Sequence, residues 1–283
     1  MRTKTLLIAS AGALAAAITS SQAQTVYSQN VVGYVNTPLV QGQNVLVANP
    51  LNGTTNSINT IMPGLQGGEL VNIWNGSGYY SYQYQGAGVG TGLGFQSDWT
   101  DNFSSPPAAP AIPGDQTDSN DGVYWAPQPV LNPGQGFFIV SPNQTETNTF
   151  TGTVVTTNTT TLTAGHTFLV ASAIPVGGDV TTNPAITLTK NFGGGEILNV
   201  WNGSGYYSYQ YQGAGVGTGL GFQSDWTDNF SSPPAAPSIP GDQTDSNDGV
   251  YWAPSPQLSV GQGFFIASPN ATENWTQTIT NIP

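Results

Sequence analysis

The sequence predicts an all-β protein made of two tandem antiparallel β-sandwich or barrel-like domains that arose by internal duplication. Residues 74–127 recur at 201–254 with one difference, Ala111 against Ser238. Within each copy, apolar and polar residues alternate at a period of two, and Gly, Pro and Asn separate the alternating stretches. Several short strands with frequent turn residues are typical of sandwiches and barrels.

Residues 1–23 are predicted to form a secretory signal peptide. Arg2 and Lys4 provide a positive start, residues 6–18 are apolar and rich in Ala, and residues 21–23 fit a cleavage site. The apolar run is shorter than the ~20 residues that span a bilayer. We therefore expect a secreted protein, extracellular or at the cell surface, without membrane insertion after cleavage.

Cleavage would leave a strongly acidic chain. Lys190 would be the single basic residue against 15 acidic ones, a net charge of −14. Repulsion from phosphate groups disfavours nucleic acid and anionic lipid as partners. The chain has no cysteine, so its stability depends on burial and backbone pairing instead of disulfides.

The duplication predicts one domain at residues 24–149 and a second at 150–283, joined without a flexible linker. An aromatic residue followed by small polar and then β-branched residues occurs three times, at 27–32, 150–155 and 275–280. Either the middle copy closes domain 1 while opening domain 2, or the last copy is an extra C-terminal strand that closes domain 2 alone. Strand addition between molecules would use the apolar positions of these copies: Tyr27, Val31, Phe150, Val154, Trp275 and Ile279.

Inside each domain the same strands are expected in the same order. Apolar runs suit central strands, a hairpin surrounds the turn Asn-Gly-Ser-Gly, and a Pro-Gly turn precedes the last central strand. In the first copy these strands are predicted at 45–48, 69–74, 79–85, 123–125 and 136–140. A long Pro-rich and then acidic loop, residues 104–122, interrupts the series.

A row of tyrosines follows the hairpin turn in both copies. Alternate tyrosines of one strand share a face, so their rings could stack on sugars as an exposed row. The same spacing also suits an aromatic ladder packed in the core. The candidate carbohydrate-binding residues are Tyr80, Tyr82, Tyr84, Tyr207, Tyr209 and Tyr211.

Glycine occupies every second position from Gly86 to Gly94. The spacing lacks the Gly-x-Gly-x-x-Gly order of a dinucleotide site, and no strand-to-helix context surrounds it. Two interpretations stay open: a strand with one bare face that aromatic rings cover, or a flexible loop.

The acidic loops are candidate calcium sites, because Ca²⁺ takes six to eight oxygen ligands. Their spacing differs from that of an EF-hand, and a solvated loop whose Asp side chains cap turns is the alternative. The candidate ligands are Asp115, Asp118, Asp121, Asp242, Asp245 and Asp248. No cofactor is otherwise required.

Catalysis is not expected. His166 is the single histidine, and its counterpart in the first copy is Gln43. Without Cys, and with one Lys after cleavage, the usual nucleophile–base sets are missing, although a paired-carboxylate glycosidase would need only two acids.

Several short motifs occur together. They are Tyr-Ser-x-Asn-x-Val-Gly-Tyr-x-Asn from Tyr27, Gly-x-Asn-x-x-x-x-Asn-Pro-Leu from Gly42, Trp-Asn-Gly, Pro-Gly-Gln-Gly-Phe-Phe from Pro133, and a closing Trp-Thr-x-Thr. In this combination the chain resembles the exported repeat proteins of planctomycete and verrucomicrobial bacteria. The resemblance implies a duplicated secreted β domain and no established activity, so it assigns no site residue.

These observations favour a structural protein of the cell surface, extracellular matrix or a filament that self-associates by strand addition. The alternative is an adhesion module that binds an extracellular polysaccharide, with or without calcium.

Overall fold

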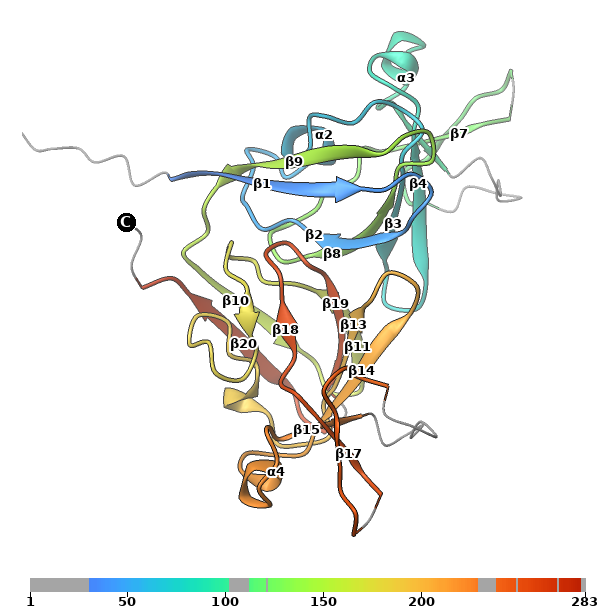
Figure 1. The fold of residues 1–283 in the computed structure, drawn as a ribbon. Helices are drawn as coiled ribbons and strands as arrows, with labels where there is room; N and C mark the ends of the chain where they lie inside the picture. The colour runs from blue at the N-terminus through green and yellow to red at the C-terminus, as the bar shows by residue number, and fades with distance from the viewer. Residues whose placement is uncertain are drawn as a thin grey trace, which may run out of the picture. The chain divides into compact units, whose positions relative to one another are not determined.

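The computed structural model describes residues 31–101, 112–120, 122–228, 238–247, 249–268 and 270–280. The predicted all-β class is confirmed: two seven-stranded antiparallel sheets, one in each repeat, dominate the structure (Figure 1). A two-stranded antiparallel sheet accompanies each of them. Among the described residues, no helix is long and apolar enough to cross a membrane.

The first repeat contains nine strands and two single-turn helices. In chain order they are β1 (Val32–Leu39), β2 (Val45–Ala48), α2 (Ile58–Ile61), β3 (Leu70–Trp74), β4 (Tyr79–Tyr84), α3 (Val89–Gly92), β5 (Trp99–Asp101), β6 (Gln116–Thr117), β7 (Tyr124–Ala126), β8 (Gly136–Val140) and β9 (Glu146–Thr153). The large sheet has the order β2-β8-β3-β4-β5-β7-β6, and β1 pairs with β9.

The second repeat follows the same plan with one added strand pair. Its elements are β10 (Thr157–Leu162), β11 (His166–Val170), β12 (Gly178–Asp179), η1 (Thr189–Asn191), β13 (Ile197–Trp201), β14 (Tyr206–Tyr211), α4 (Val216–Gly219), β15 (Trp226–Asp228), β16 (Gln243–Thr244), β17 (Tyr251–Ala253), β18 (Gln257–Leu258), β19 (Phe264–Ser268) and β20 (Glu273–Thr278). The large sheet has the order β11-β19-β13-β14-β15-β17-β16, β10 pairs with β20, and β12 pairs with β18.

The expected hairpin is β3–β4. Trp74 pairs with Tyr79, and the side chain of Asn75 accepts hydrogen bonds from the backbone N–H groups of Ser77 (3.1 Å) and Gly78 (2.9 Å). These bonds satisfy donors in the tight turn, as Asn does in an Asx-turn. The second repeat has the same hairpin with Trp201 opposite Tyr206.

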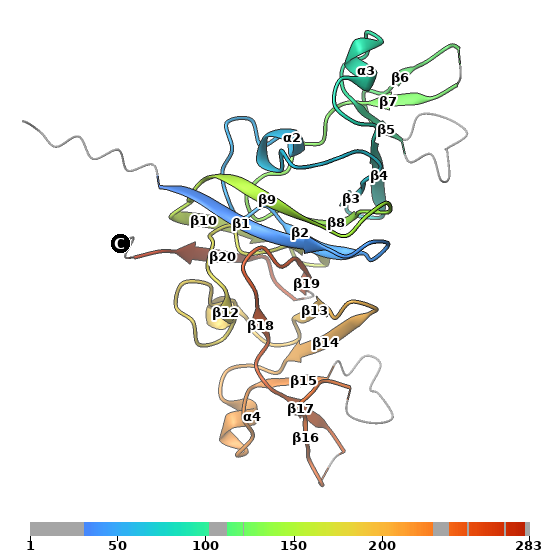
Figure 2. The same ribbon diagram turned by 45° about the horizontal axis from the view of Figure 1, so that its top comes forward.

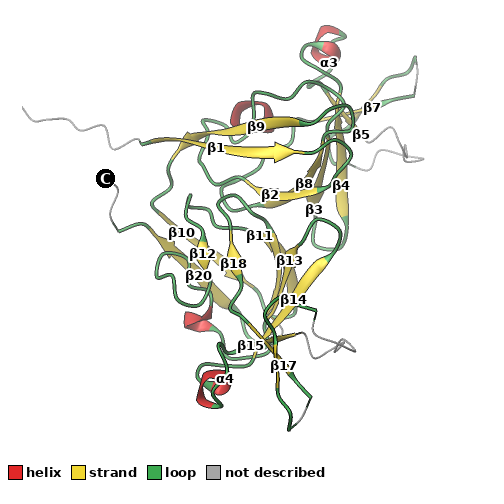
Figure 3. Cartoon of the chain, viewed as in Figure 1, coloured by secondary structure: helices red, strands yellow, loops and turns green. Residues whose placement is uncertain are grey.

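The glycine run contradicts both interpretations of the sequence, because its centre is the helical turn α3 (Figure 3). Both carboxylate oxygens of Asp98 accept backbone hydrogen bonds, from Gly88 (2.8 Å) and Thr91 (2.9 Å). A Cβ on Gly90 would collide with the ring of Trp125 and with a backbone carbonyl. The glycines therefore allow a turn to pass close to an aromatic ring.

Two of the three expected strand copies have the same role, because each closes one repeat. β9 pairs along its whole length with β1, from Val32 opposite Thr153 to Leu39 opposite Glu146, and so spans the predicted boundary between residues 149 and 150. β20 pairs with β10, so the C-terminal copy at 275–280 closes the second repeat. The middle copy thus closes the first repeat, because its residues complete the ladder with β1.

Each repeat buries its own aromatic and aliphatic core between the large sheet and the smaller one. Phe137 and Phe150 meet at 6.3 Å in the first core, and Phe264 and Trp275 meet at 5.6 Å in the second. All four side chains are buried. Because burial contributes about 25 cal/mol per Å² of apolar surface, these large aromatic side chains stabilise each core.

The two repeats meet through equivalent residues. Trp74 Nε1 donates to the carbonyl of Thr167 (3.2 Å), and its counterpart Trp201 donates to the carbonyl of Asn44 (3.1 Å), which corresponds to Thr167. A small apolar cluster, formed by Leu46, Phe138, Leu169 and Phe265, lies between them. The contacts are reciprocal, as in a two-fold interface.

This interface covers one edge of each large sheet. The N–H of Ala48, at the end of edge strand β2, donates to the carbonyl of Gly261 (2.8 Å), and that of Ala171, just after β11, donates to Gly134 (2.9 Å). The opposite ends of the sheets carry β6–β7 and β16–β17, which Figure 2 shows far from each other. Unpaired strand edges can pair with another molecule. The contact between the repeats therefore makes the edges at β2 and β11 unavailable for such pairing.

Candidate functional site

The Tyr row is packed rather than exposed. Tyr82, Tyr84, Tyr209 and Tyr211 are buried, and Tyr84 and Tyr211 lie 5.0 and 5.1 Å from the rings of Trp99 and Trp226. The expectation of an exposed stacking row is therefore wrong. The cause is that the face carrying these rings is the face that covers the core.

Tyr80 and Tyr207 stand at the border of the cores, where they are partly buried. Burial raises the pKa of Tyr209 to about 12, and the nearby charge of Asp242 adds to this effect. Its phenol therefore stays protonated at neutral pH and can donate a hydrogen bond.

The acidic loops use their carboxylates for local structure. Asp115 accepts a hydrogen bond from the N–H of Ile112 (3.0 Å), and Asp118 accepts one from Asn120 (2.8 Å). In the second repeat, Asp242 and Asp245 make the corresponding bonds to Ile239 and Asn247. Asp121 and Asp248 lie outside the described residues.

No metal cluster of three or more His, Cys, Asp or Glu side chains is found in the part of the chain that the structure describes. Asp115 instead faces Asp101, and Asp242 faces Asp228. Burial, and then the charge of the facing carboxylate, raises the pKa of Asp115 and of Asp242 to about 6. Each pair can share a proton, because two carboxylates in contact cannot both ionise freely.

The candidate assembly residues are divided between the cores and the surface. Phe150 and Trp275 are buried, and the indole N–H of Trp275 donates to the carbonyl of Ile186 (3.1 Å). Val154 and Ile279 pack against the two cores, and Tyr27 lies outside the described residues. Val31 is exposed just before β1.

β1, which has eight residues, has one edge that pairs with no other described strand. Its single strand neighbour among the described residues is β9. Val32 and Tyr34 on its outer face are 57% and 71% exposed. The corresponding strand β10 has Thr157 at the position of Tyr34 and carries mostly Thr and Asn.

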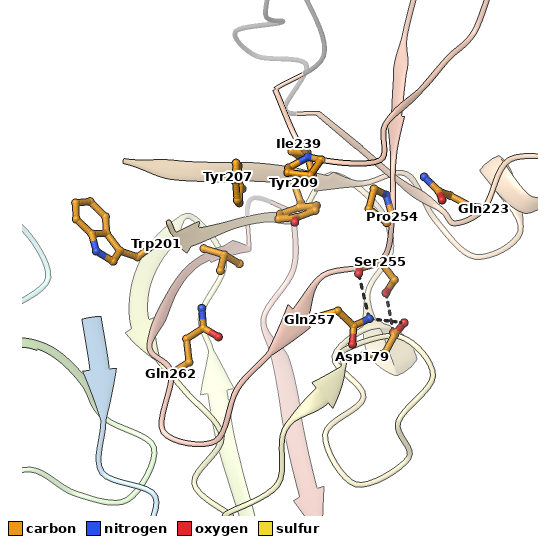
Figure 4. Close-up of a pocket in the computed structure, with 12 residues that line it drawn as sticks. Asp179, Trp201, Tyr207, Tyr209, Gln223, Ile239, Pro254, Ser255, Gln257 and Gln262 are labelled. Carbon is orange, nitrogen blue, oxygen red and sulfur yellow. Dashed lines mark hydrogen bonds between the residues drawn. The ribbon is translucent and has the colours of Figure 1, made fainter. Parts of the chain in front are cut away.

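The second repeat contains a cavity of about 500 Å³ (Figure 4). Tyr207 and Tyr209 lie on one side of it, and Gln257, Gln262 and Asp179 lie on the other. The cavity is completed by Val200, Trp201, Gln223, Ile239, Pro240, Pro254 and Ser255.

Asp179 organises the polar side of the cavity. Ser255 Oγ donates to its Oδ1 (2.7 Å), and Gln257 Nε2 donates to its Oδ2 (3.0 Å). Burial alone would raise the pKa of Asp179, but hydrogen bonds from Ser255, Thr181 and Thr182, and from Gln257, outweigh this and lower it. The carboxylate is therefore ionised at neutral pH and fixed in place.

The first repeat has the aromatic side of this cavity without the same polar side. The bridge between Ser57 and Val130 corresponds to the pairing of Asp179 with Gln257, because Ile58 and Val180 donate to the equivalent carbonyls of Pro129 and Pro256. Ser57 therefore replaces the acid and Val130 replaces the amide. The aromatic residues lie in the near-identical block and so occur in both repeats, whereas Asp179 and Gln257 lie outside the block and occur only in the second repeat.

The sequence prediction missed Asp179, Gln257 and Ser255. All three lie where the two copies diverge, either in the loop of different length or directly after the identical block. The sequence difference between the two copies beside their near-identical block is the signal that could have pointed to these residues. Comparison of the chain with protein-family models, curated proteins and solved structures finds no match.

Proposed function

We propose that this chain is an exported structural protein of the cell surface, extracellular matrix or a filament, and that copies associate by adding a strand to β1. The observation that carries the proposal is the open edge of β1 beside the exposed side chains of Val32 and Tyr34. Long apolar edge strands that nothing covers are sites of strand addition.

The contrast with the other edges supports this proposal. The edge strands β2 and β11 lie at the interface between repeats, and the outer edge strands β6 and β16 contain only two residues each. β1 has eight residues and no charged side chain. Natural proteins protect edges with charge, brevity or cover; β1 is neither charged nor short, and no described strand pairs with its outer edge.

Proline limits where the added strand can pair. Pro38 has no backbone N–H, so the pairing is expected over the part of β1 that precedes it, Val32 to Thr37. Six residues are close to the usual length of a strand. The low charge density of the chain, 6% charged residues, leaves little local repulsion against such contact.

The test is the association state of the exported chain. Sedimentation velocity and negative-stain electron microscopy are expected to show concentration-dependent oligomers of the wild type and their loss in Tyr34→Lys. The matched control is Thr157→Lys, at the equivalent place on β10, which should associate like the wild type. A wild type that stays monomeric at high concentration, or equal loss in both variants, would refute the proposal.

A further inference from the structure

We propose that the cavity of the second repeat binds a neutral saccharide, and that the first repeat does not. A cavity of about 500 Å³ lies within the ~300–1,000 Å³ usual for small-molecule sites. Its lining combines aromatic rings with amide, hydroxyl and carboxylate groups (Figure 4). A sugar ring matches both kinds of group, because its apolar C–H face can stack on an aromatic ring and its hydroxyls can form hydrogen bonds with polar side chains.

The aromatic side supplies the apolar contact. Tyr207 and Tyr209 line the cavity: Tyr207 is only partly buried, and Tyr209, which is largely buried, is held by its edge-to-face contact with Trp226 at 6.3 Å. The indole of Trp201 lies on the opposite face of β13, where it packs against Tyr206 (5.0 Å) and Phe138 (5.6 Å), so it is not part of this aromatic side. Rings that are already fixed lose little conformational freedom when a ligand binds.

The polar side supplies directional hydrogen bonds. The bonds that Asp179 accepts from Ser255 and Gln257 hold all three groups in one geometry before a ligand arrives. A carboxylate accepts hydrogen bonds from hydroxyls, and an amide both donates and accepts. Preorganised polar groups of this kind confer specificity in otherwise apolar sites.

Charge selects the class of saccharide. Asp179 is ionised, and the only Lys or Arg beyond residue 4 is Lys190, which does not line the cavity. A uronic acid or a sulfated sugar would meet an uncompensated carboxylate, so acidic glycans are disfavoured. The ligand is therefore expected to be an uncharged oligosaccharide.

The duplication provides a matched control within the same molecule. Tyr80 is the equivalent of Tyr207, and Ser57 with Val130 stands where Asp179 with Gln257 stands. A residue needed only for packing should matter equally in both repeats. A residue needed for the ligand should matter only in the second.

The experiment uses the full exported chain and a panel of neutral hexasaccharides built from glucose, mannose, xylose or N-acetylglucosamine, with an oligogalacturonate as the acidic probe. Binding is first detected by saturation-transfer NMR and then measured by calorimetry. We expect at least one neutral probe to bind and the acidic probe not to bind.

Four variants then locate the site. Tyr207→Ala should weaken binding about tenfold or more, through loss of ring contact, and Tyr80→Ala should leave it unchanged. Gln257→Val, at an exposed position, should weaken binding about threefold to tenfold through loss of one or two hydrogen bonds. Asp179→Ser together with Gln257→Val, which places the first-repeat residues at these two positions, should abolish measurable binding.

Thermal melting of every variant separates loss of the ligand contact from loss of the fold. If Tyr207→Ala proves unstable, Gln257→Val still tests the proposal, because the side chain of Gln257 is exposed and lies outside the core. The proposal is overturned if no neutral probe binds the wild type, if the acidic probe binds as well as a neutral one, or if Tyr80→Ala and Tyr207→Ala have equal effects.

Discussion

Glu273 begins β20 and points into the second repeat, where only 7% of it is exposed. It forms a hydrogen bond with Glu196, whose carboxylate also accepts the N–H groups of Gly193 (3.2 Å) and Gly194 (3.0 Å). Burial, and then the charge of Glu196, raises the pKa of Glu273 from 4.5 to about 7. Replacing Glu273 by Gln would remove this titration while keeping a group that can donate to Glu196.

The direction of the effect follows from proton binding. Between about pH 4.5 and pH 7 the folded protein holds a proton at Glu273 that the unfolded chain has released. The free energy of unfolding therefore falls as the pH rises through this window. A rise from 4.5 to about 7 corresponds to at most about 3–4 kcal/mol, at about 1.4 kcal/mol per pKa unit, and solvent screening reduces this to about 1–3 kcal/mol.

Urea unfolding followed by Trp fluorescence measures this directly. Between about pH 4.5 and pH 7.5, Glu273→Gln should lose about 1–3 kcal/mol less than the wild type. Asp115 and Asp242 have raised pKa values of about 6, so they leave part of the slope in the variant.

The first repeat supplies the control. Glu146 is the equivalent of Glu273, but its carboxylate accepts hydrogen bonds from Gln144 (3.0 Å) and Asn148 (3.0 Å) instead of facing an acid. Glu146→Gln should keep the wild-type slope. A wild-type stability that rises from pH 5 to pH 7.5, or equal slopes for Glu273→Gln and Glu146→Gln, would contradict a proton held by Glu273.

Two further predictions concern packing. Gly217→Ala should lower the free energy of unfolding by about 1–3 kcal/mol, because its Cβ would collide with the ring of Trp252 and the carbonyl of Ser224. Gly219→Ala in the same turn has open space around its Cβ and should be tolerated. Thermal melting compares the two variants, and equal melting temperatures would contradict the collision. Trp275→Ala should cost about 3–5 kcal/mol in urea unfolding, because a buried indole and its hydrogen bond to Ile186 are lost, and an unchanged stability would mean that β20 is dispensable.

The regular part of the fold could be predicted from local patterns. The alternation from Tyr79 to Tyr84 and the turn that begins at Asn75 predict the hairpin, because period and turn chemistry act within a few residues. The same alternation could not decide whether the rings are exposed. Burial depends on which face of the sheet meets the second layer, β1 and β9, and that is a property of the whole repeat.

Contacts between distant residues explain what the sequence could not provide. The turn at Gly90 depends on the hydrogen bonds to Asp98 and on the close approach to the ring of Trp125. The spacing of the glycines in the sequence reveals neither contact. The pairing of Asp179 with Gln257 joins segments 78 positions apart, and only the structure brings them together. The strand copies at 150 and 275 were recognised as strands, but their partners were left open because strand pairing is non-local.

The open edge of β1 can be examined residue by residue through amide hydrogen exchange at increasing protein concentration. We expect the amides of Val32–Thr37 that point away from β9 to gain protection as concentration rises, while Thr157–Leu162 of β10 keep a constant exchange rate. Exchange in β1 that stays fast at every concentration, or protection that appears equally in β10, would contradict association through this edge.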